Sequence, residues 1–414
     1  MQLTILKFAG ILSISMMSCN DGPVPAREEN GREMGSSLDT LPPVETKAAN
    51  SEYKPAFKGQ TRINGVKTPF AVQHSVVTDK LSKPWGIAQM PDGRFFVTEK
   101  GGSMKIVFSD GQLSDAIKNV PEVDARGQGG LLGVALDPNF TTNRMVYFAF
   151  SEKYGKGNLS SFAKARLSDD EKSLENVTVI YRAMPDHNGT LHYGGRLLFD
   201  KQGNLLITTG ERSDIETRPL AQDKKSGLGK IIRITTDGKP AAGNPFLNDP
   251  SFLPEIYSWG HRNVQGIAFH PETGQLYNNE FGPRGGDELN KVEAGKNYGW
   301  PLITYGIEYS GDIVQPGKTQ QDGLEQPIYY WDPVISPSGM TFYNGTTIPE
   351  WKNDLFIASL NLPHVTRLVL KDGKVVGEER LLADEKQRFR DIIVGKDGNL
   401  YAVTDYGRLY KIGK

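Results

Sequence analysis

One pattern recurs six times along this chain: a short apolar run, a turn rich in Asp, Gly or Pro, and a second apolar run. The clearest copy starts at Gly86 and turns at Asp92-Gly93. Alternating apolar residues on both sides of such a turn predict a β-hairpin. The other copies begin near Gly133, Gly195, Gly266, Gly339 and Asp391.

Hairpins of this kind cannot bury their apolar faces alone, so they stack on copies of themselves. Repeats spaced by roughly 45 to 75 residues are typical of β-propellers, in which four-stranded blades surround a central channel. We therefore expect an all-β fold, a six-bladed β-propeller with four-stranded antiparallel blades. A β-sandwich or an open meander is the alternative, and the six-fold recurrence favours the propeller. A strand near residues 70–77 is expected to pair with the last blade and close the ring.

The N-terminus has the pattern of a secretory signal. Lys7 is followed by an apolar run over residues 8–17 and then by Ser18-Cys19. The run is too short for a transmembrane helix, which needs about 20 residues. The stretch ending at Cys19 resembles a bacterial lipobox, so residues 1–19 are predicted to be a lipoprotein-type signal peptide. Cys19 would then carry the lipid that anchors the protein at the bacterial cell envelope, as its only membrane contact. The alternative is an ordinary signal peptide with an incidental cysteine.

The remaining chain divides into two parts. Residues 20–61 are polar and rich in Pro, Glu, Ser and Gly, which predicts a flexible tether. The repeats continue to the last residues, so residues 62–414 are expected to form one propeller domain. A hydrophobic content of 37%, with 46 Gly and 25 Pro, suits a turn-dense soluble β protein with a core. The net charge is −1 and no basic tract is interleaved with aromatic residues, so no nucleic-acid partner is expected.

Several polar residues stand at the same phase of the repeat, just before the first strand of a hairpin. In a propeller the innermost strand lies along the axis, so residues that enter it line one mouth of the channel. The repeat therefore predicts that a small set of side chains shares one pocket: Gln128, His192, Arg262, Asn263, Arg388 and Arg390.

The residue types in this set indicate a ligand. Arg388 and Arg390, two positions apart on an extended strand, point to the same face and can clamp a planar ligand that carries carboxylates. His192 is the natural proton acceptor near neutral pH. A structural histidine and two solvated arginines are the alternative, and the shared phase and surrounding glycines favour a site.

The segment from Glu280 to Asn290 contains, after Glu280 itself, two carboxylates, an Asn and several tight turns. Loops rich in oxygen atoms bind Ca²⁺, often through main-chain carbonyls. A plain turn between blades, with Asp287 capping Asn290, is the alternative. The residue types alone leave both interpretations open.

Seven short strings occur in order between about residue 70 and residue 414. They are Gly127–Gly133, His192–Arg196, Gly260–Gly266, Gly282–Asn290, Tyr298–Pro301, Pro333–Ser338 and Arg388–Asp391. Together they resemble the glucose/sorbosone dehydrogenase family, the soluble aldose sugar dehydrogenases that use pyrroloquinoline quinone (PQQ). The resemblance implies a six-bladed propeller, in agreement with the repeat count.

The resemblance also implies a reaction. An oxidoreductase of this family oxidises the C1 hydroxyl of an aldose sugar to a lactone, with hydride transfer to PQQ and onward transfer of electrons to an acceptor that the sequence does not identify. His192 would be the base that takes the proton from the anomeric hydroxyl. Arg262, with the cofactor-binding Asn263, would polarise the quinone carbonyl.

The remaining roles follow the same resemblance. Arg388 and Arg390 would hold the carboxylates of the cofactor, and Gln128 would contact the sugar. The main-chain carbonyls of Gly282 and Pro283 would be ligands of a Ca²⁺ ion beside the cofactor.

Three positions depart from the family pattern. Leu191 stands where glucose-oxidising members carry an Asp, Phe281 where His is common, and Asn361 about where a quinone-contacting Lys is found. Two other functions are therefore kept as alternatives. One is a hydrolase of propeller fold such as a Ca²⁺-dependent lactonase, and the other is a non-catalytic propeller that binds glycan or protein. A pocket of Arg, His and amide groups suits an anionic cofactor better than a hydrolytic metal site.

Overall fold

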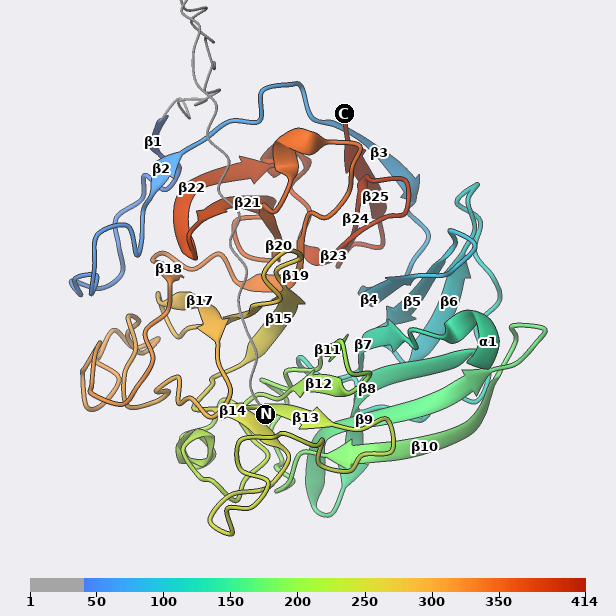
Figure 1. Ribbon diagram of the computed structural model, residues 1–414, viewed down its shortest axis with the longest axis horizontal. Helices are drawn as coiled ribbons and strands as arrows, with labels where there is room; N and C mark the ends of the chain where they lie inside the picture. The colour runs from blue at the N-terminus through green and yellow to red at the C-terminus, as the bar shows by residue number, and fades with distance from the viewer. Residues whose placement is uncertain (1–40) are drawn as a thin grey trace, which may run out of the picture. The chain divides into compact units, whose positions relative to one another are not determined.

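Six β-sheets are arranged in a ring in the computed structural model, which describes residues 41–414 (Figure 1). The strands within each blade pair in antiparallel fashion and follow one another along the chain. The predicted six-bladed β-propeller is thus confirmed. The predicted signal peptide with Cys19 and the first part of the predicted tether lie outside the described residues.

The first three blades cover residues 84–259. Blade one contains β4 (Pro84–Gln89), β5 (Phe95–Glu99) and β6 (Ser103–Val107), with a single bridge to Leu113 in place of a fourth strand. Blade two contains β7 (Leu131–Leu136), β8 (Met145–Tyr154), β9 (Gly157–Leu167) and β10 (Leu174–Arg182), with helix α1 (Phe140–Asn143) in its first turn. Blade three contains β11 (Leu197–Phe199), β12 (Leu205–Thr208), β13 (Lys230–Ile234) and β14 (Ile256–Trp259).

The last three blades complete the ring. Blade four contains β15 (Val264–Phe269), β16 (Leu276–Glu280), β17 (Asp287–Val292) and β18 (Tyr329–Trp331). Blade five contains β19 (Pro337–Phe342), β20 (Leu355–Ser359), β21 (His364–Lys371) and β22 (Lys374–Leu381). Blade six contains β23 (Phe389–Val394), β24 (Leu400–Thr404) and β25 (Leu409–Gly413). Short 3₁₀ turns occur at Arg218–Ala221, Pro349–Trp351 and Ala383–Glu385, and no helix within residues 41–414 is long and apolar enough to cross a bilayer.

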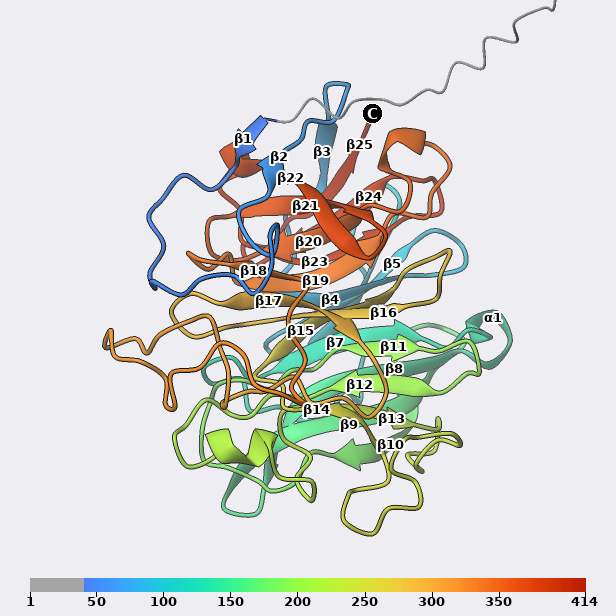
Figure 2. The same cartoon turned by 60° about the vertical axis from the view of Figure 1, so that its left-hand side comes forward.

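A strand from the start of the domain closes the ring. β3 (Gln73–Thr78) pairs with β25 in antiparallel register, with His74 opposite Ile412, and lies beside it in both ribbon views (Figure 2). The expected closure by residues 70–77 is therefore confirmed. The pairing covers the backbone edge that β25 would otherwise expose.

The apolar residues of the repeats meet between neighbouring blades. Phe96 of blade one packs with Phe148 and Phe150 of blade two, and all three are at most 2% exposed. Trp351 and Phe356 of blade five pack in the same way with Phe389 of blade six. Each sheet buries a face against the next one, which explains the alternation in the sequence.

Residues 41–61 differ from the expected flexible tether. Here β1 (Leu41–Pro43) pairs with β2 (Asn64–Gly65), which extends the sheet of blade five beside β22. Asn50 donates its main-chain N–H and its side-chain amide to Asp332 Oδ1 at 2.8 Å. Gln60 is fully buried and donates to the carbonyl of Pro327. Specific polar contacts of this kind, which composition does not reveal, dock the segment on blades four and five.

A buried ion pair lies where the inner strands converge. Arg196, just before β11, contacts Asp391 of β23 at 2.7 Å. Its guanidinium also donates to the carbonyl of Gln265 on β15 at 2.6 Å and to that of Arg390 at 2.9 Å. The ring of Trp85 on β4 lies 4.1 Å from the guanidinium carbon. One side chain thus connects the inner strands of blades one, three, four and six.

This arrangement predicts a strong coupling between the two charges. Arg196→Met leaves Asp391 buried without its partner, which is expected to lower the free energy of unfolding by about 3–5 kcal/mol. The double variant Arg196→Met/Asp391→Leu removes both charges and is expected to recover a large part of that loss, as urea unfolding will measure. Additive losses in the double variant would contradict this account.

Candidate active site

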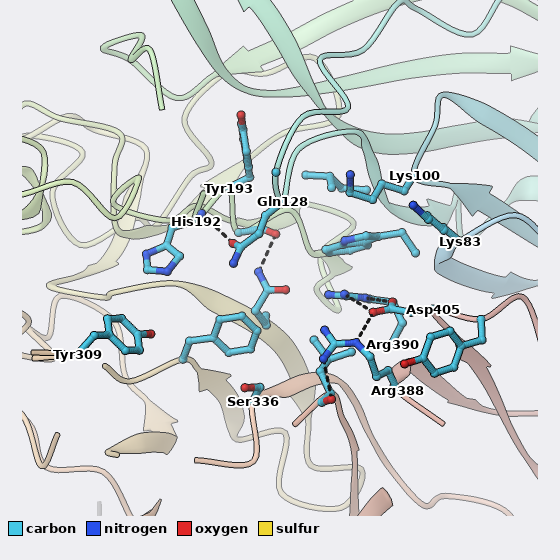
Figure 3. A pocket seen from close by; sticks show the side chains of 18 residues that line it. Lys83, Lys100, Gln128, His192, Tyr193, Tyr309, Ser336, Arg388, Arg390 and Asp405 are labelled. Carbon is cyan, nitrogen blue, oxygen red and sulfur yellow. Dashed lines mark hydrogen bonds and ion pairs between the residues drawn. The ribbon is translucent and has the colours of Figure 1, made fainter. Parts of the chain in front are cut away.

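A cavity of about 520 Å³ lies at the end of the axis where the chain enters the inner strands (Figure 3). Four of the predicted site residues line it: Gln128, His192, Arg388 and Arg390. They come from positions just before or within the first strands of blades two, three and six. The structure therefore brings these distant residues together at one mouth of the channel.

The other predicted residues lie beside this cavity rather than on its wall. Arg262 lines a smaller adjoining cavity with Gly282 and Pro283, and Phe281 lies on both cavities. Asn263 is fully buried, and its Oδ1 accepts hydrogen bonds from the main chain of Gly194 at 3.0 Å and from Gln265 at 3.3 Å. The predicted set thus forms two neighbouring groups that share one aromatic wall.

His192 is held by a carboxylate that the sequence analysis does not include. Its Nδ1 lies 2.8 Å from Glu211 Oε2, and its main-chain N–H donates to Gln128 Oε1 at 2.9 Å. Both His192 and Glu211 are buried, at 4% and 1% exposure. The bond to a carboxylate assigns the proton of the neutral ring to Nδ1. Among the described residues no hydrogen bond engages Nε2, which is therefore the proton-accepting atom of the ring.

Burial and charge act in opposite directions on this pair. Burial lowers the pKa of His192 below its usual value, although Glu211 acts to raise it. Burial acts to raise the pKa of Glu211, but the hydrogen bond from His192, the charge of Arg262 and a hydrogen bond from Ser213 hold it below the usual range. The result is a neutral imidazole beside an ionised carboxylate, the state that a general base requires.

Two glycines explain the local shape of the chain at this histidine. His192 has a φ of 47°, and Gly194 and Gly195 have φ values of 66° and 99°. A Cβ on Gly194 would lie 2.5 Å from the carbonyl oxygen of Thr208. Only glycine fits there, because the turn presses against the next strand.

The two arginines of blade six share one carboxylate. Arg388 Nε donates to Asp405 Oδ2 at 2.9 Å, and Arg390 donates to both oxygens at 2.8 and 3.0 Å. Burial acts to raise the pKa of Asp405, but the two guanidinium groups hold it below the usual range. The two side chains point to the same side, as their spacing predicts, and Asp405 fixes them there.

The cavity wall is cationic and aromatic. Lys83 and Lys100 of blade one join the two arginines, so the wall contains four cationic side chains and a single carboxylate, that of Asp405. The aromatic residues of the wall are Trp85, Tyr193, Phe281, Tyr309 and Tyr406. Tyr309 and Tyr406 are 72% and 61% exposed and stand at the rim. Such a wall suits a flat ligand with several negative charges.

One of the two predicted metal ligands, the carbonyl of Gly282, already has a partner. The carbonyl of Gly282 accepts a hydrogen bond of 2.6 Å from Arg262, and the carboxylates of Glu280 and Glu288 line the same small cavity. Asp287 does not cap Asn290; it accepts hydrogen bonds from the main chain of Gly282 and of Ser336. Within residues 41–414 no three His, Cys, Asp or Glu side chains are arranged as metal ligands. Calcium at Gly282 and Pro283 therefore stays a prediction.

The three departures from the family pattern have different surroundings. Phe281 is part of the cavity wall, whereas Leu191 is 40% exposed and Asn361 donates its side-chain amide to the carbonyl of Val334 at 3.1 Å. The amide of Asn361 is thus held by the main chain of the connection between blades four and five.

Four of the cavity residues outside the predicted set share one position, directly after the second strand of a hairpin. They are Lys100, Phe281, Leu360 and Asp405, and all four line the cavity. The second strand runs back to the mouth where the first strand begins, so its end faces the same space. A search at this phase of the repeat would have found them.

The geometry of His192 predicts its protonation state. At about pH 6.5, where an ordinary histidine is half protonated, His192 is expected to remain neutral with its proton on Nδ1, because its pKa is lowered. Nitrogen-15 NMR of labelled protein will measure this, with His192→Gln to assign the signal. In Glu211→Gln the preference for the Nδ1 proton is expected to weaken. A His192 signal that is half protonated at this pH would contradict the prediction.

Comparisons with known proteins agree with this geometry. A family model described as Glucose / Sorbosone dehydrogenase matches residues 81–411. The chain is similar to Aldose sugar dehydrogenase YliI of Escherichia coli (strain K12), with 40% identity over 83% of this chain and 93% of the relative. Among solved structures it is similar to a glucose dehydrogenase, with a TM-score of 0.79 and 43% identity over 83% of this chain and 99% of the other. It is also similar to the PQQ-bound form of an aldose sugar dehydrogenase from Streptomyces coelicolor, with a TM-score of 0.69 and 30% identity over 83% and 99% of the two chains. As its ordered motifs predicted, the chain belongs to the glucose/sorbosone dehydrogenase family.

Proposed function

We propose that this protein is a quinoprotein dehydrogenase that oxidises aldose sugars at C1 to lactones, with PQQ held in the axial cavity. The observation that carries the proposal is the meeting of His192 with a cationic, aromatic wall in one cavity. Family membership supports it, as do the names of the relatives, an aldose sugar dehydrogenase and a PQQ-bound structure.

The residues present fit this cofactor. PQQ is a flat tricarboxylic acid, and the cavity wall has four cationic groups against one carboxylate. Beside the cavity, Arg262 Nε and Asn263 Nδ2 are buried without a hydrogen-bond acceptor in the described part of the chain. Buried donors of this kind are costly unless a ligand supplies the acceptor. Carbonyl oxygens of a bound quinone would satisfy them.

Each residue then has a definite task. Arg388 and Arg390 bind carboxylates by paired hydrogen bonds. Arg262 and Asn263 would donate to a carbonyl of the quinone, where donors in a buried site stabilise developing charge. When bound, the quinone supplies the hydride acceptor. Gly282 and Pro283 are proposed as ligands of a Ca²⁺ ion beside it, which requires Arg262 to release the carbonyl of Gly282.

The proton of the sugar goes to His192. Nε2 accepts it from the anomeric hydroxyl, and the ring becomes positively charged. Glu211, hydrogen-bonded to Nδ1, stabilises that charge in a buried setting where the attraction is strong. Gln128 holds the main chain of His192 and stands on the cavity wall, where it is proposed to contact the sugar.

The two alternatives lack comparable support. A lactonase with an axial metal needs carboxylates directed into the cavity, whereas the only carboxylate on the wall, Asp405, is bound by two arginines. A non-catalytic propeller does not require a buried proton acceptor with an ionised partner.

The dehydrogenase proposal predicts sugar-dependent reduction of an artificial dye by protein loaded with PQQ and Ca²⁺. His192→Ala is expected to lower the rate by about 10²–10⁴-fold, the usual contribution of a general base. A titration that follows the quinone absorption spectrum is the control, because this variant should still bind the cofactor. A quinone that does not bind would refute the proposal, and binding without dye reduction by any aldose would favour a non-catalytic protein.

We also propose that the protein is lipid-anchored at the bacterial cell envelope. The support is the lipobox-like stretch before Cys19. Expressed in a bacterial host, the full chain is expected in the membrane fraction and Cys19→Ser in the soluble fraction, as immunoblotting of the fractions will show. Equal partitioning of the two proteins would favour an ordinary signal peptide.

A further inference from the structure

Two lysines of blade one face the cavity without an assigned task. Lys83 lies just before β4 and Lys100 just after β5, and the main-chain N–H of Lys100 donates to the carbonyl of Lys83 at 3.0 Å. Figure 3 shows both side chains on the side of the cavity where Arg390 and Asp405 lie. The backbone bond keeps the two lysines together at the mouth.

The same backbone bond occurs in the neighbouring blade. The N–H of Asp405, just after β24, donates to the carbonyl of Arg388, just before β23, at 2.9 Å. Lys83 therefore occupies in blade one the place that Arg388 occupies in blade six. If Arg388 meets a carboxylate of the ligand, the equivalent place one blade further presents a second cation to the same ligand.

The backbone of Lys83 provides an independent observation. Its φ is 49°, in the left-handed region that is unfavourable for residues with a side chain. His192 and Ser336, at 47° and 52°, are the other two non-glycine residues of the cavity wall with this conformation. Strained residues of this kind cluster at functional sites, where the surrounding structure maintains them. A long cationic side chain at such a place indicates a use for its charge.

The charge of the wall is not balanced by the protein. Asp405 pairs with both arginines of blade six. Its single negative charge therefore compensates only one of their two positive charges. Neither lysine forms an ion pair within residues 41–414, although Lys100 donates to the carbonyl of Ala125 at 2.6 Å. Burial, and then the charges of Lys83 and Arg390, lower the pKa of Lys100. Three uncompensated positive charges match a ligand with three carboxylates.

The lysine that the family pattern leads one to expect on blade five is absent. Asn361 stands about there, and its amide donates to the main chain of Val334. Blade one, on the other side of the two arginines, carries the two cations instead.

We propose that Lys83 and Lys100 form an anion-binding pair that holds a carboxylate of the cofactor and replaces the cation missing from blade five. This inference rests on the proposed function. It predicts that blade one contributes to the affinity for the cofactor, although neither lysine belongs to the motifs that identify the family.

The test is a titration of the metal-loaded protein with PQQ, followed by the quinone absorption spectrum at several salt concentrations. Lys83→Asn removes the charge but keeps a residue that tolerates left-handed φ. This variant and Lys100→Gln are each expected to raise the Kd about three- to tenfold. The double variant is expected to raise it further and to weaken the salt dependence. Lys371→Gln, an exposed lysine of β21 outside the cavity, is the matched control and should leave the Kd unchanged.

The outcomes separate the two proposals. If the unaltered protein does not bind PQQ, the proposed function fails and this inference fails with it. If the unaltered protein binds and the double variant has the same Kd and salt dependence, only the lysine pair is refuted. Lys83→Arg/Lys100→Arg keeps both charges and should bind within about twofold of the unaltered protein if the pair acts by charge. Thermal unfolding of every variant shows whether a loss of binding reflects a loss of folding.

Discussion

The contacts of Arg196 at the axis are the interaction on which the site depends. The guanidinium contacts Asp391 and the carbonyl of Arg390 on β23, the carbonyl of Gln265 on β15 and the ring of Trp85 on β4. Trp85 and Arg390 are both on the cavity wall, and the carbonyl of Arg390 accepts a hydrogen bond from the Arg196 guanidinium. A buried ion pair contributes little net stability compared with apolar packing, but its geometry is specific. Here the contacts of Arg196 fix the positions of the inner strands relative to one another. They thereby also fix the position of the proton acceptor on blade three relative to the cations on blades one and six.

The propeller builds an asymmetric site from a repeated backbone. In blades one, four, five and six, the residue after the second strand donates its N–H to the carbonyl of the residue before the first strand. These paired positions surround one mouth. They carry Lys83 with Lys100 in blade one, Ser336 with Leu360 in blade five and Arg388 with Asp405 in blade six. A common scaffold thus presents cations, a carboxylate and apolar groups from fixed directions, and blade three adds the histidine and its glutamate.

Much of the fold and part of the site could be predicted from the sequence. The recurring hairpins predicted six blades. The polar residues that precede the first strand of a hairpin predicted four residues of the cavity wall, Gln128, His192, Arg388 and Arg390. The same reasoning missed Glu211 and Asp405, because it followed only the entry to each hairpin and not its return. Composition also placed residues 41–61 in a tether, since a polar segment that docks by specific hydrogen bonds has the same composition as a free one.

The sequence by itself determined the class of the fold, the number of blades and the mouth at which the polar residues gather, because these follow from local periodicity and turn chemistry. The tertiary structure decided which side chains meet. His192 and Glu211 are 19 residues apart and Arg388 and Asp405 are 17 apart, and each pair contacts only because a strand returns to the same mouth. Arg262 lies behind Phe281 rather than on the open wall for the same reason. Side-chain pairing, burial and the resulting charges depend on packing between blades, which no local pattern encodes.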